Sequence, residues 1–323
     1  MELSQRPPDA VDVATVVERM RTYAAASRAE NTWKAYKSDL KHFARWCAEL
    51  GITDAVPAQP RLVAAYLAEH AGELAVSTLS RRLYALSALH RIGGHPVPAD
   101  APEVQAVWSG IKRTHGTAPA QKAPARTKVI SAMLEPLDDD SPIDVRDRAL
   151  LLIGFAGAFR RSELVAFDVD DITDADEGLH IVVRKSKSDQ EGEGAVVGVP
   201  YGSNPATCPV RAWRAWLTVR DDNDLTDAVP AFLSIAKGGK ISERRLPAYA
   251  VARIVKRRAD AAGIDGDFAA HSLRAGFATE AFSNTVQELL VMRHGRWKSS
   301  SSMRGYIREG SLWGDNAAAK LGL

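Results

Sequence analysis

The chain has 323 residues, of which 46% are hydrophobic and 25% are charged, and its formal net charge is only +2. This length supplies one large or two medium domains, each with its own core. The near-neutral balance excludes a polycation, so a nucleic-acid partner would have to be met by basic faces on an otherwise balanced surface.

The sequence contains neither a membrane signal nor a disulfide pattern. No run of about 18 apolar residues occurs, and the start MELSQRPPDA lacks a basic-then-apolar leader. The two cysteines, Cys47 and Cys208, are too few for a disulfide scaffold and fit a reducing compartment. We therefore expect a soluble cytoplasmic protein with no membrane partner.

Residues 1–9 are polar and rich in proline and predict a disordered tail, whereas residues 10–115 predict helices only. The clearest helix begins near Asn31, a capping residue, and ends near Gly51. Its apolar residues recur at steps of three and four, which places them on one helical face: Trp33, Tyr36, Leu40, Phe43, Cys47 and Leu50. A second helix of the same design is predicted over 76–94.

Basic side chains flank the apolar face of both helices. For either helix alone, a solvated surface is the favoured explanation. Two such helices in one bundle give the DNA-binding interpretation equal standing. The contacts that it predicts are Lys34, Lys37, Lys41, Arg81 and Arg82.

The composition shifts between 112 and 128, where Ala, Pro, Gly and Thr are mixed with lysine and arginine and no acidic residue occurs. The segment has no apolar period, so we predict a linker over 116–128 and a further domain over 129–323. The linker is either a solubilising hinge or a basic strap along a phosphate backbone. The second interpretation predicts these DNA contacts: Lys112, Arg113, Lys122 and Arg126.

Beyond residue 129 the helices are joined by short strands. β-Branched residues around a polar, glycine-containing turn predict a hairpin over 179–200. A strongly basic helix over 246–263 adds Lys256 and Arg257 to the predicted DNA contacts. The predicted fold class is mainly α, with a small β component in the C-terminal domain.

An acidic run over 168–174 superficially resembles a calcium-binding loop. Such a loop requires glycine at its sixth position and glutamate at its twelfth, where this chain has Thr173 and Leu179. No histidine and cysteine cluster has the spacing of a zinc site either. We predict no metal site.

The chemistry is concentrated near the C-terminus. His271 and Arg274 stand three apart, which places both on one face of a helix, and Trp297 and Tyr306 follow. Cleavage of a phosphodiester without metal requires cations that hold the phosphate oxygens, a nucleophile that loses a proton and a leaving oxygen that gains one. The spacing of His271 and Arg274 is not decisive by itself, because His42 and Arg45 share it on a helix that we interpret as surface.

Four segments together resemble the tyrosine recombinase (phage integrase) family: GFAGAFRRSELVAFDVDDI, RKSKSDQ, HSLR and RHGRWKSSSSMRGYIRE. The helical N-terminal half, with NTWKAY and WC, is similar to the core-binding domain of that family. The resemblance runs from about residue 10 to the end. It implies a two-domain DNA clamp, in which a helical core-binding domain precedes an α+β catalytic domain. Trp297 and the ending MRGYIR resemble the simple, Cre-like members.

The resemblance also implies roles for individual residues. Arg160 and Arg274 would clamp the scissile phosphate and stabilise its transition state. Glu163 would orient its neighbours, and its place three residues after Arg160 favours that arginine over Arg161. Lys187, in preference to Lys185, would protonate the departing 5′ oxygen.

The remaining implied roles belong to three residues near the C-terminus. His271 would assist the deprotonation of Tyr306 or bind the phosphate. Trp297 offers one N–H to a phosphate oxygen but cannot relay a proton. Tyr306 would form a 3′-phosphotyrosine.

A site-specific recombinase is therefore expected, with double-stranded DNA bearing an inverted-repeat core site as its partner. Strand exchange would need a homo-tetramer on DNA and a Holliday junction, but no ATP, metal or other cofactor. A type IB topoisomerase and a catalytically silent DNA-binding regulator remain as alternatives. So little sequence precedes the first helices that no arm-binding domain is expected. The end, with Leu321 and Leu323, is either a frayed terminus or a segment that docks into a neighbouring protomer.

Overall fold

The computed structural model describes residues 30–117, 122–184, 194–236, 238–310, 312 and 321. The described residues form two compact units, one on each side of the step from residue 120 to 121. The predictions for the tail over 1–9, for Lys185 and Lys187, and for Leu323 lie outside the described residues, and Leu321 is exposed.

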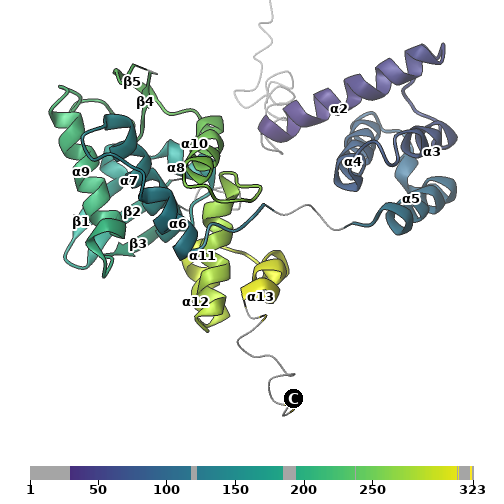
Figure 1. Cartoon of the computed structure of the whole chain (residues 1–323). Helices are drawn as coiled ribbons and strands as arrows, with labels where there is room; N and C mark the ends of the chain where they lie inside the picture. Colours follow the sequence, from purple (N-terminus) through teal and green to yellow (C-terminus); the bar gives the residue numbers. More distant parts are fainter. Residues whose placement is uncertain are drawn as a thin grey trace, which may run out of the picture. The chain divides into compact units, whose positions relative to one another are not determined.

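The first unit consists of helices α2 (Glu30–Glu49), α3 (Pro60–Glu69), α4 (Val76–Ile92) and α5 (Pro102–His115), with a short 3₁₀ turn, η1 (Pro98–Asp100), before α5 (Figure 1). The predicted apolar face of α2 is confirmed for Phe43 and Cys47, which are buried against Tyr66 of α3 and Leu79 of α4. Leu50 lies past the end of α2 and is exposed, so its assignment to this face was wrong. Asn31 lies inside α2 and does not cap it.

Arg82 also differs from its prediction. Its side chain is buried, and one terminal nitrogen donates to the Tyr66 hydroxyl at 2.8 Å and lies 3.0 Å from Nδ1 of His42. Arg82 therefore joins α4 to α3 and α2 inside the first unit, and its guanidinium is not available to DNA. His42, which we took for a surface residue, belongs to the same polar network.

The second unit is larger and contains all the described strands. Its helices are α6 (Thr127–Leu134), α7 (Pro142–Ala156), α8 (Arg161–Ala166), α9 (Pro209–Asp221), α10 (Ala248–Ala261), α11 (His271–Ser283), α12 (Glu288–Gly295) and α13 (Arg304–Gly310). Helix α7 is buried along most of its length and packs on α9 and α11. Trp213 and Trp216 of α9 fill the core beside it. This arrangement places the first turn of α11 over the end of α7.

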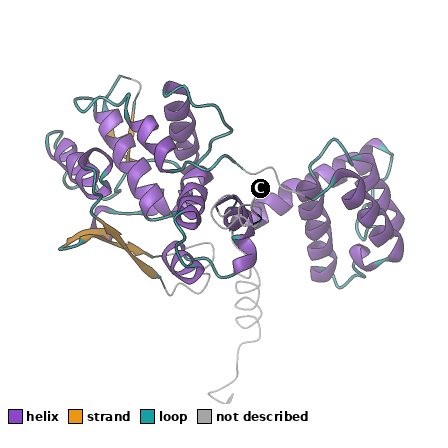
Figure 2. Cartoon of the chain, turned by 60° about the horizontal axis from the view of Figure 1, so that its bottom comes forward, coloured by secondary structure: helices purple, strands orange, loops and turns teal. Residues whose placement is uncertain are grey.

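The strands form two small antiparallel sheets, drawn in orange in Figure 2. One sheet has the order β1 (Ile172–Ala175), β2 (Gly178–Val183), β3 (Ala195–Pro200), and the other pairs β4 (Leu233–Ile235) with β5 (Ile241–Arg245). The predicted hairpin is the β2–β3 pair, so that prediction is confirmed. The other strands were not predicted, because they are short. The predicted mainly α fold with a small β component is confirmed.

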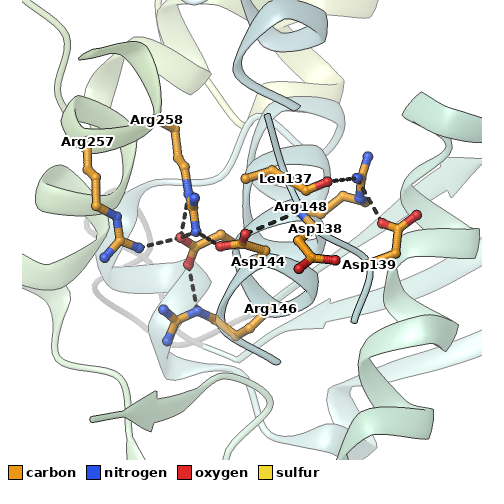
Figure 3. Close-up of polar contacts among 9 residues, drawn as sticks. Leu137, Asp138, Asp139, Asp144, Arg146, Arg148, Arg257 and Arg258 are labelled. Carbon is orange, nitrogen blue, oxygen red and sulfur yellow. Dashed lines mark hydrogen bonds and ion pairs between the residues drawn. The ribbon is translucent and has the colours of Figure 1, made fainter. Parts of the chain in front are cut away.

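A buried carboxylate fixes the basic helix α10 against α7. The Asp147 side chain is fully buried and forms ion pairs with Arg146 at 2.8 Å and with Arg257 and Arg258 at 2.5 Å. Arg258 also binds Asp144, as Figure 3 shows. Burial lowers the pKa of Arg146, although Asp147 opposes that shift. One acid thus pairs with three arginines inside the second unit.

Residues 122–126, called the strap here, run along helix α11. The N–H of Ala123 donates to the Asp267 carbonyl at 3.1 Å, and that of Ala125 donates to the Ser272 carbonyl at 2.9 Å. Arg126 then binds Glu280 at 2.8 Å and the Ser283 hydroxyl at 3.0 Å. A Cβ at Gly276 would lie 2.0 Å from the Ala125 carbonyl oxygen, so only glycine allows this close approach.

Candidate active site

Arg160 is held by the carboxylate three residues later. It precedes α8, its backbone N–H donates to Oε2 of Glu163 at 3.0 Å, and its guanidinium binds Oε1 at 2.6 Å. Glu163 is buried, whereas Arg161 points to the exposed surface. The geometry therefore pairs Glu163 with Arg160, the arginine that the motif spacing favours.

Arg274 is buried in the first turns of α11 with its charge only partly compensated. One terminal nitrogen donates to the Ala158 carbonyl, and the guanidinium lies 3.8 Å above the Trp297 ring. The other terminal nitrogen, Nη2, is buried without a hydrogen-bond partner. Burial, together with the positive charges of Arg160 and Arg296, lowers the pKa of Arg274 to about 9. An anion placed here would satisfy the free nitrogen and offset the repulsion.

His271 and Tyr306 form a direct hydrogen bond. Nε2 of His271 lies 2.7 Å from the phenolic oxygen, which α13 presents toward the start of α11. The packing around the imidazole, with the charges of Arg274 and Arg160, lowers the pKa of His271, although part of its side chain remains open to solvent. Burial raises the pKa of Tyr306. The pair is thus a neutral phenol beside a neutral imidazole that can accept its proton.

Trp297 packs between Arg274 and Tyr306. Its ring centroid lies 6.2 Å from that of Tyr306, with the ring planes at 61°. The indole folds back over Gly295, where a Cβ would lie 1.7 Å from the ring. The indole of Trp297 can therefore occupy this position only because residue 295 at the end of α12 has no side chain.

The structure thus brings together six of the seven predicted catalytic residues: Arg160, Glu163, His271, Arg274, Trp297 and Tyr306. Lys187 is the seventh and belongs to the masked segment between β2 and β3, outside the described residues. Within the described parts of the chain, no group of three or more His, Cys, Asp or Glu side chains is arranged to hold a metal ion.

The predicted DNA contacts fall into groups of different availability. Within the described residues, several are exposed and form no ion pair with a described acid: Lys37, Lys41, Lys112, Arg113 and Lys256. Others are exposed but paired with an acid: Lys34 with Glu30, Arg81 with Asp39, Lys122 with Asp267 and Arg257 with Asp147. Arg126 is half-buried on Glu280. The pairs of Lys34 and Lys122 join two exposed side chains and are weak, so these lysines remain able to exchange the acid for a phosphate. Arg81 and Arg257 are held by buried carboxylates instead.

Two further residues contribute to the site and were not assigned from the sequence. Arg296 reaches Oε2 of Glu163 at 3.1 Å. His294 lies with Nε2 2.7 Å from the Ala156 carbonyl and stacks on Phe277. The only signal in the sequence was the basic cluster RHGR directly before Trp297.

Comparison with known proteins decides the family. Residues 125–311 match the model of the phage integrase family, and residues 22–92 match the phage integrase N-terminal SAM-like domain. The chain belongs to the phage integrase family. It is a tyrosine recombinase, so the predicted family and enzyme class are confirmed.

Similar proteins carry recombinase names. The integrase/recombinase xerD homolog of Selenomonas ruminantium is 36% identical over 299 residues, covering 91% of this chain and 86% of the relative. Tyrosine recombinase XerD of Bifidobacterium longum is 31% identical over 271 residues, covering 80% and 82%. The narrower likeness to Cre-like enzymes stays a prediction.

Solved structures of similar fold include recombinase–DNA complexes. The XerH recombinase in a post-cleavage complex with palindromic difH matches with a TM-score of 0.67 at 17% identity, covering 90% of this chain and 80% of that one. A lambda integrase tetramer on a Holliday junction matches with a TM-score of 0.60 at 14% identity, covering 96% and 81%. At these identities the likeness concerns the fold alone. In the described part of this chain, no helix is long and apolar enough to span a membrane.

Proposed function

We propose that this tyrosine recombinase cleaves and rejoins DNA at a specific core site through a covalent 3′-phosphotyrosine on Tyr306. The observation that carries the proposal is the buried Nη2 of Arg274, which has no hydrogen-bond partner and lies beside the His271–Tyr306 pair. A scissile phosphate supplies the missing acceptor and lies next to the nucleophile. Arg160 provides the second positive charge, held by Glu163.

In the cleavage step the phenolic oxygen of Tyr306 attacks phosphorus while its proton passes to Nε2 of His271. Burial raises the pKa of the phenol, so the proton has to leave during the attack and not before it. Arg160 and Arg274 stabilise the charge on the pentacoordinate phosphorus. The bond from phosphorus to the 5′ oxygen breaks, and this oxygen takes a proton from Lys187, the residue in the β2–β3 connection that the proposal assigns as general acid.

Rejoining reverses these events with a different strand. A 5′ hydroxyl attacks the phosphotyrosine, and Tyr306 leaves as the phenol. The phosphotyrosine bond retains the free energy of the broken phosphodiester, so neither a nucleotide nor a metal has to enter the reaction.

Exchange between two duplexes needs four such sites. We therefore propose a homo-tetramer on two duplexes, each with an inverted-repeat core site, and a Holliday junction intermediate. The fold shared with a lambda integrase tetramer on a Holliday junction supports this arrangement. We propose that the protein acts in the cytoplasm, on the nucleoid, because the proposed substrate is DNA.

The test is covalent trapping on DNA. Purified protein is incubated with core-site duplexes that carry a nick near the cleavage position, so that the short 5′-hydroxyl strand diffuses away and the adduct accumulates. Wild type is expected to form an SDS-resistant adduct, and Tyr306→Phe is expected to bind the same DNA and form none. An adduct that persists in Tyr306→Phe refutes the assignment of the nucleophile.

Two further outcomes would redirect the proposal. Relaxation of any supercoiled plasmid without sequence preference indicates a topoisomerase that acts alone. Tight binding by wild type without cleavage of any core-site duplex indicates a DNA-binding regulator.

A further inference from the structure

Arg296 occupies an unusual backbone position behind the two arginines of the site. It follows the last residue of α12 with φ +59°, in the left-handed region that glycine adopts most easily. The described residues contain three other non-glycine positions with positive φ, and one of them is Ala158 in the same site. Backbone strain of this kind persists where favourable contacts of the residue offset its free-energy cost.

The side chain of Arg296 is 10% exposed, and several acceptors surround both of its terminal nitrogens. Nη1 donates to the His294 carbonyl at 3.0 Å, and Nη2 donates to Oε2 of Glu163 at 3.1 Å. Longer bonds of 3.4 Å reach the carbonyls of Gly157 and Ala158. The guanidinium also lies 4.9 Å over the Phe159 ring.

One consequence concerns Arg160. The carboxylate of Glu163 is almost completely buried, and its two oxygens are divided between two arginines: Oε1 binds Arg160, and Oε2 binds both the Arg160 N–H and Arg296. Removing one partner of a buried carboxylate leaves its charge less compensated and its position less constrained. Arg296 therefore determines where Glu163, and through it the Arg160 guanidinium, is directed.

The other consequence concerns Arg274. Nη1 of Arg274 donates to the carbonyl of Ala158, which lies in the turn between α7 and α8. The Arg296 guanidinium also donates to this carbonyl. Arg296 also donates to the carbonyl of Gly157 in the same turn. The same guanidinium thus fixes the acceptor that orients Arg274.

We propose that Arg296 is a positioning residue that sets the spacing of the Arg160 and Arg274 guanidinium groups for the scissile phosphate. It acts through Glu163 and the 157–159 turn and does not touch the DNA. A lysine cannot replace it, because a single ammonium lacks the planar fork that reaches a carboxylate and several carbonyls at once. This inference rests on the proposed cleavage reaction.

The backbone conformation offers a clean test. Arg296→Gly removes the side chain and relieves the positive-φ strain, which offsets part of the loss of its buried contacts, and thermal unfolding measured beside wild type checks that the variant is folded at the assay temperature. On the nicked core-site duplex, the single-turnover rate of adduct formation is expected to fall on the order of 100-fold. The affinity for DNA is expected to stay unchanged. Arg293→Ala removes one exposed positive charge three residues earlier and is expected to retain both rate and affinity.

Two additional measurements separate positioning from general structural support. Free guanidinium ion at millimolar concentration is expected to restore part of the Arg296→Gly rate, and not to raise that of Arg293→Ala. In a Glu163→Gln background, Arg296→Gly is expected to add less than its effect in wild type, because the part of the effect that passes through Glu163 is already lost while the part that passes through the 157–159 turn remains.

The outcomes distinguish this inference from the function on which it rests. If wild type forms no adduct with core-site DNA, the proposed function fails. If wild type forms the adduct and Arg296→Gly forms it equally fast, only the positioning role is refuted. A loss of DNA affinity that matches the loss of rate, with a reduced salt dependence of binding, means that Arg296 binds a phosphate directly and also overturns the proposal.

Discussion

Nε2 of His271 lies 2.7 Å from the phenolic oxygen of Tyr306, although the two residues are 35 positions apart in the chain. The contact joins the first turn of α11 to α13, and it gives the proton of the nucleophile a defined acceptor. Because burial and the nearby arginines lower the pKa of His271 below its ordinary value of 6.5, the imidazole is neutral and competent at physiological pH.

A pH dependence follows from that lowered pKa. Cleavage requires neutral His271, so the single-turnover rate is expected to stay high as pH falls to 6.5 and to decline only below that ordinary value. His271→Gln is expected to be slower by about 100-fold or more and to lose this acidic limb. Rates measured on the nicked duplex across the pH range check both expectations. An acidic limb that is unchanged in His271→Gln assigns the titration to another group.

Gly295 makes room for the indole beside Arg274. In Gly295→Ala the new Cβ would lie 1.7 Å from the Trp297 ring, so the indole has to move away. We expect slower adduct formation and a destabilisation of about 1–3 kcal/mol, as for other overpacked sites. Urea unfolding and single-turnover cleavage measure the two effects. Retention of the wild-type rate would mean that the indole position does not matter for cleavage.

Because residues 122–126 pack against Gly276, we expect alanine substitutions at two helical glycines, Gly276 and Gly110, to change the free energy of unfolding differently. Gly276→Ala places a Cβ 2.0 Å from the Ala125 carbonyl, against backbone that cannot turn aside, and is expected to lower the free energy of unfolding by about 1–3 kcal/mol. Gly110→Ala, inside α5 with open space around it, is expected to be neutral or to stabilise by up to about 1 kcal/mol. Equal effects in chemical denaturation would contradict the close packing of the strap.

We expect removal of the Asp147 negative charge to lower the free energy of unfolding strongly. Asp147→Asn leaves three arginines without their shared anion, and we expect a cost of about 3–5 kcal/mol. Asp139→Asn is a matched control, because Asp139 is highly exposed where it pairs with Arg148 and is expected to change stability by less than about 1 kcal/mol. Figure 3 shows the arginine partners of both acids. Similar costs for the two variants, measured by urea unfolding, would refute a central role of Asp147.

The parts of the site that the sequence predicts are those with local spacing. Arg160 with Glu163, and His271 with Arg274, stand three apart on helical segments, and the tyrosine motif is contiguous. The role of Arg296 was not predictable in this way. It depends on the meeting of the α12 end with the 157–159 turn, which are far apart in the chain.

The fold shows the same division between local and tertiary information. The α2 stripe and the β2–β3 hairpin follow from periodicity and turn residues. The prediction of Arg82 as a DNA contact was wrong because the direction of its side chain is set by Tyr66 and His42 on other helices. Charge alone does not distinguish a basic residue that faces DNA from one that serves a buried hydroxyl.

The hydrogen bonds of residues 122–126 to α11 bear on how the catalytic half should be expressed on its own. A fragment that begins at residue 129 would leave the Ser272 carbonyl and the Glu280 carboxylate without the partners described above, and would uncover the surface at Gly276. A fragment that begins before Lys122 retains them. We therefore expect the longer fragment to be the more soluble and the more resistant to proteolysis, because it keeps residues 122–128.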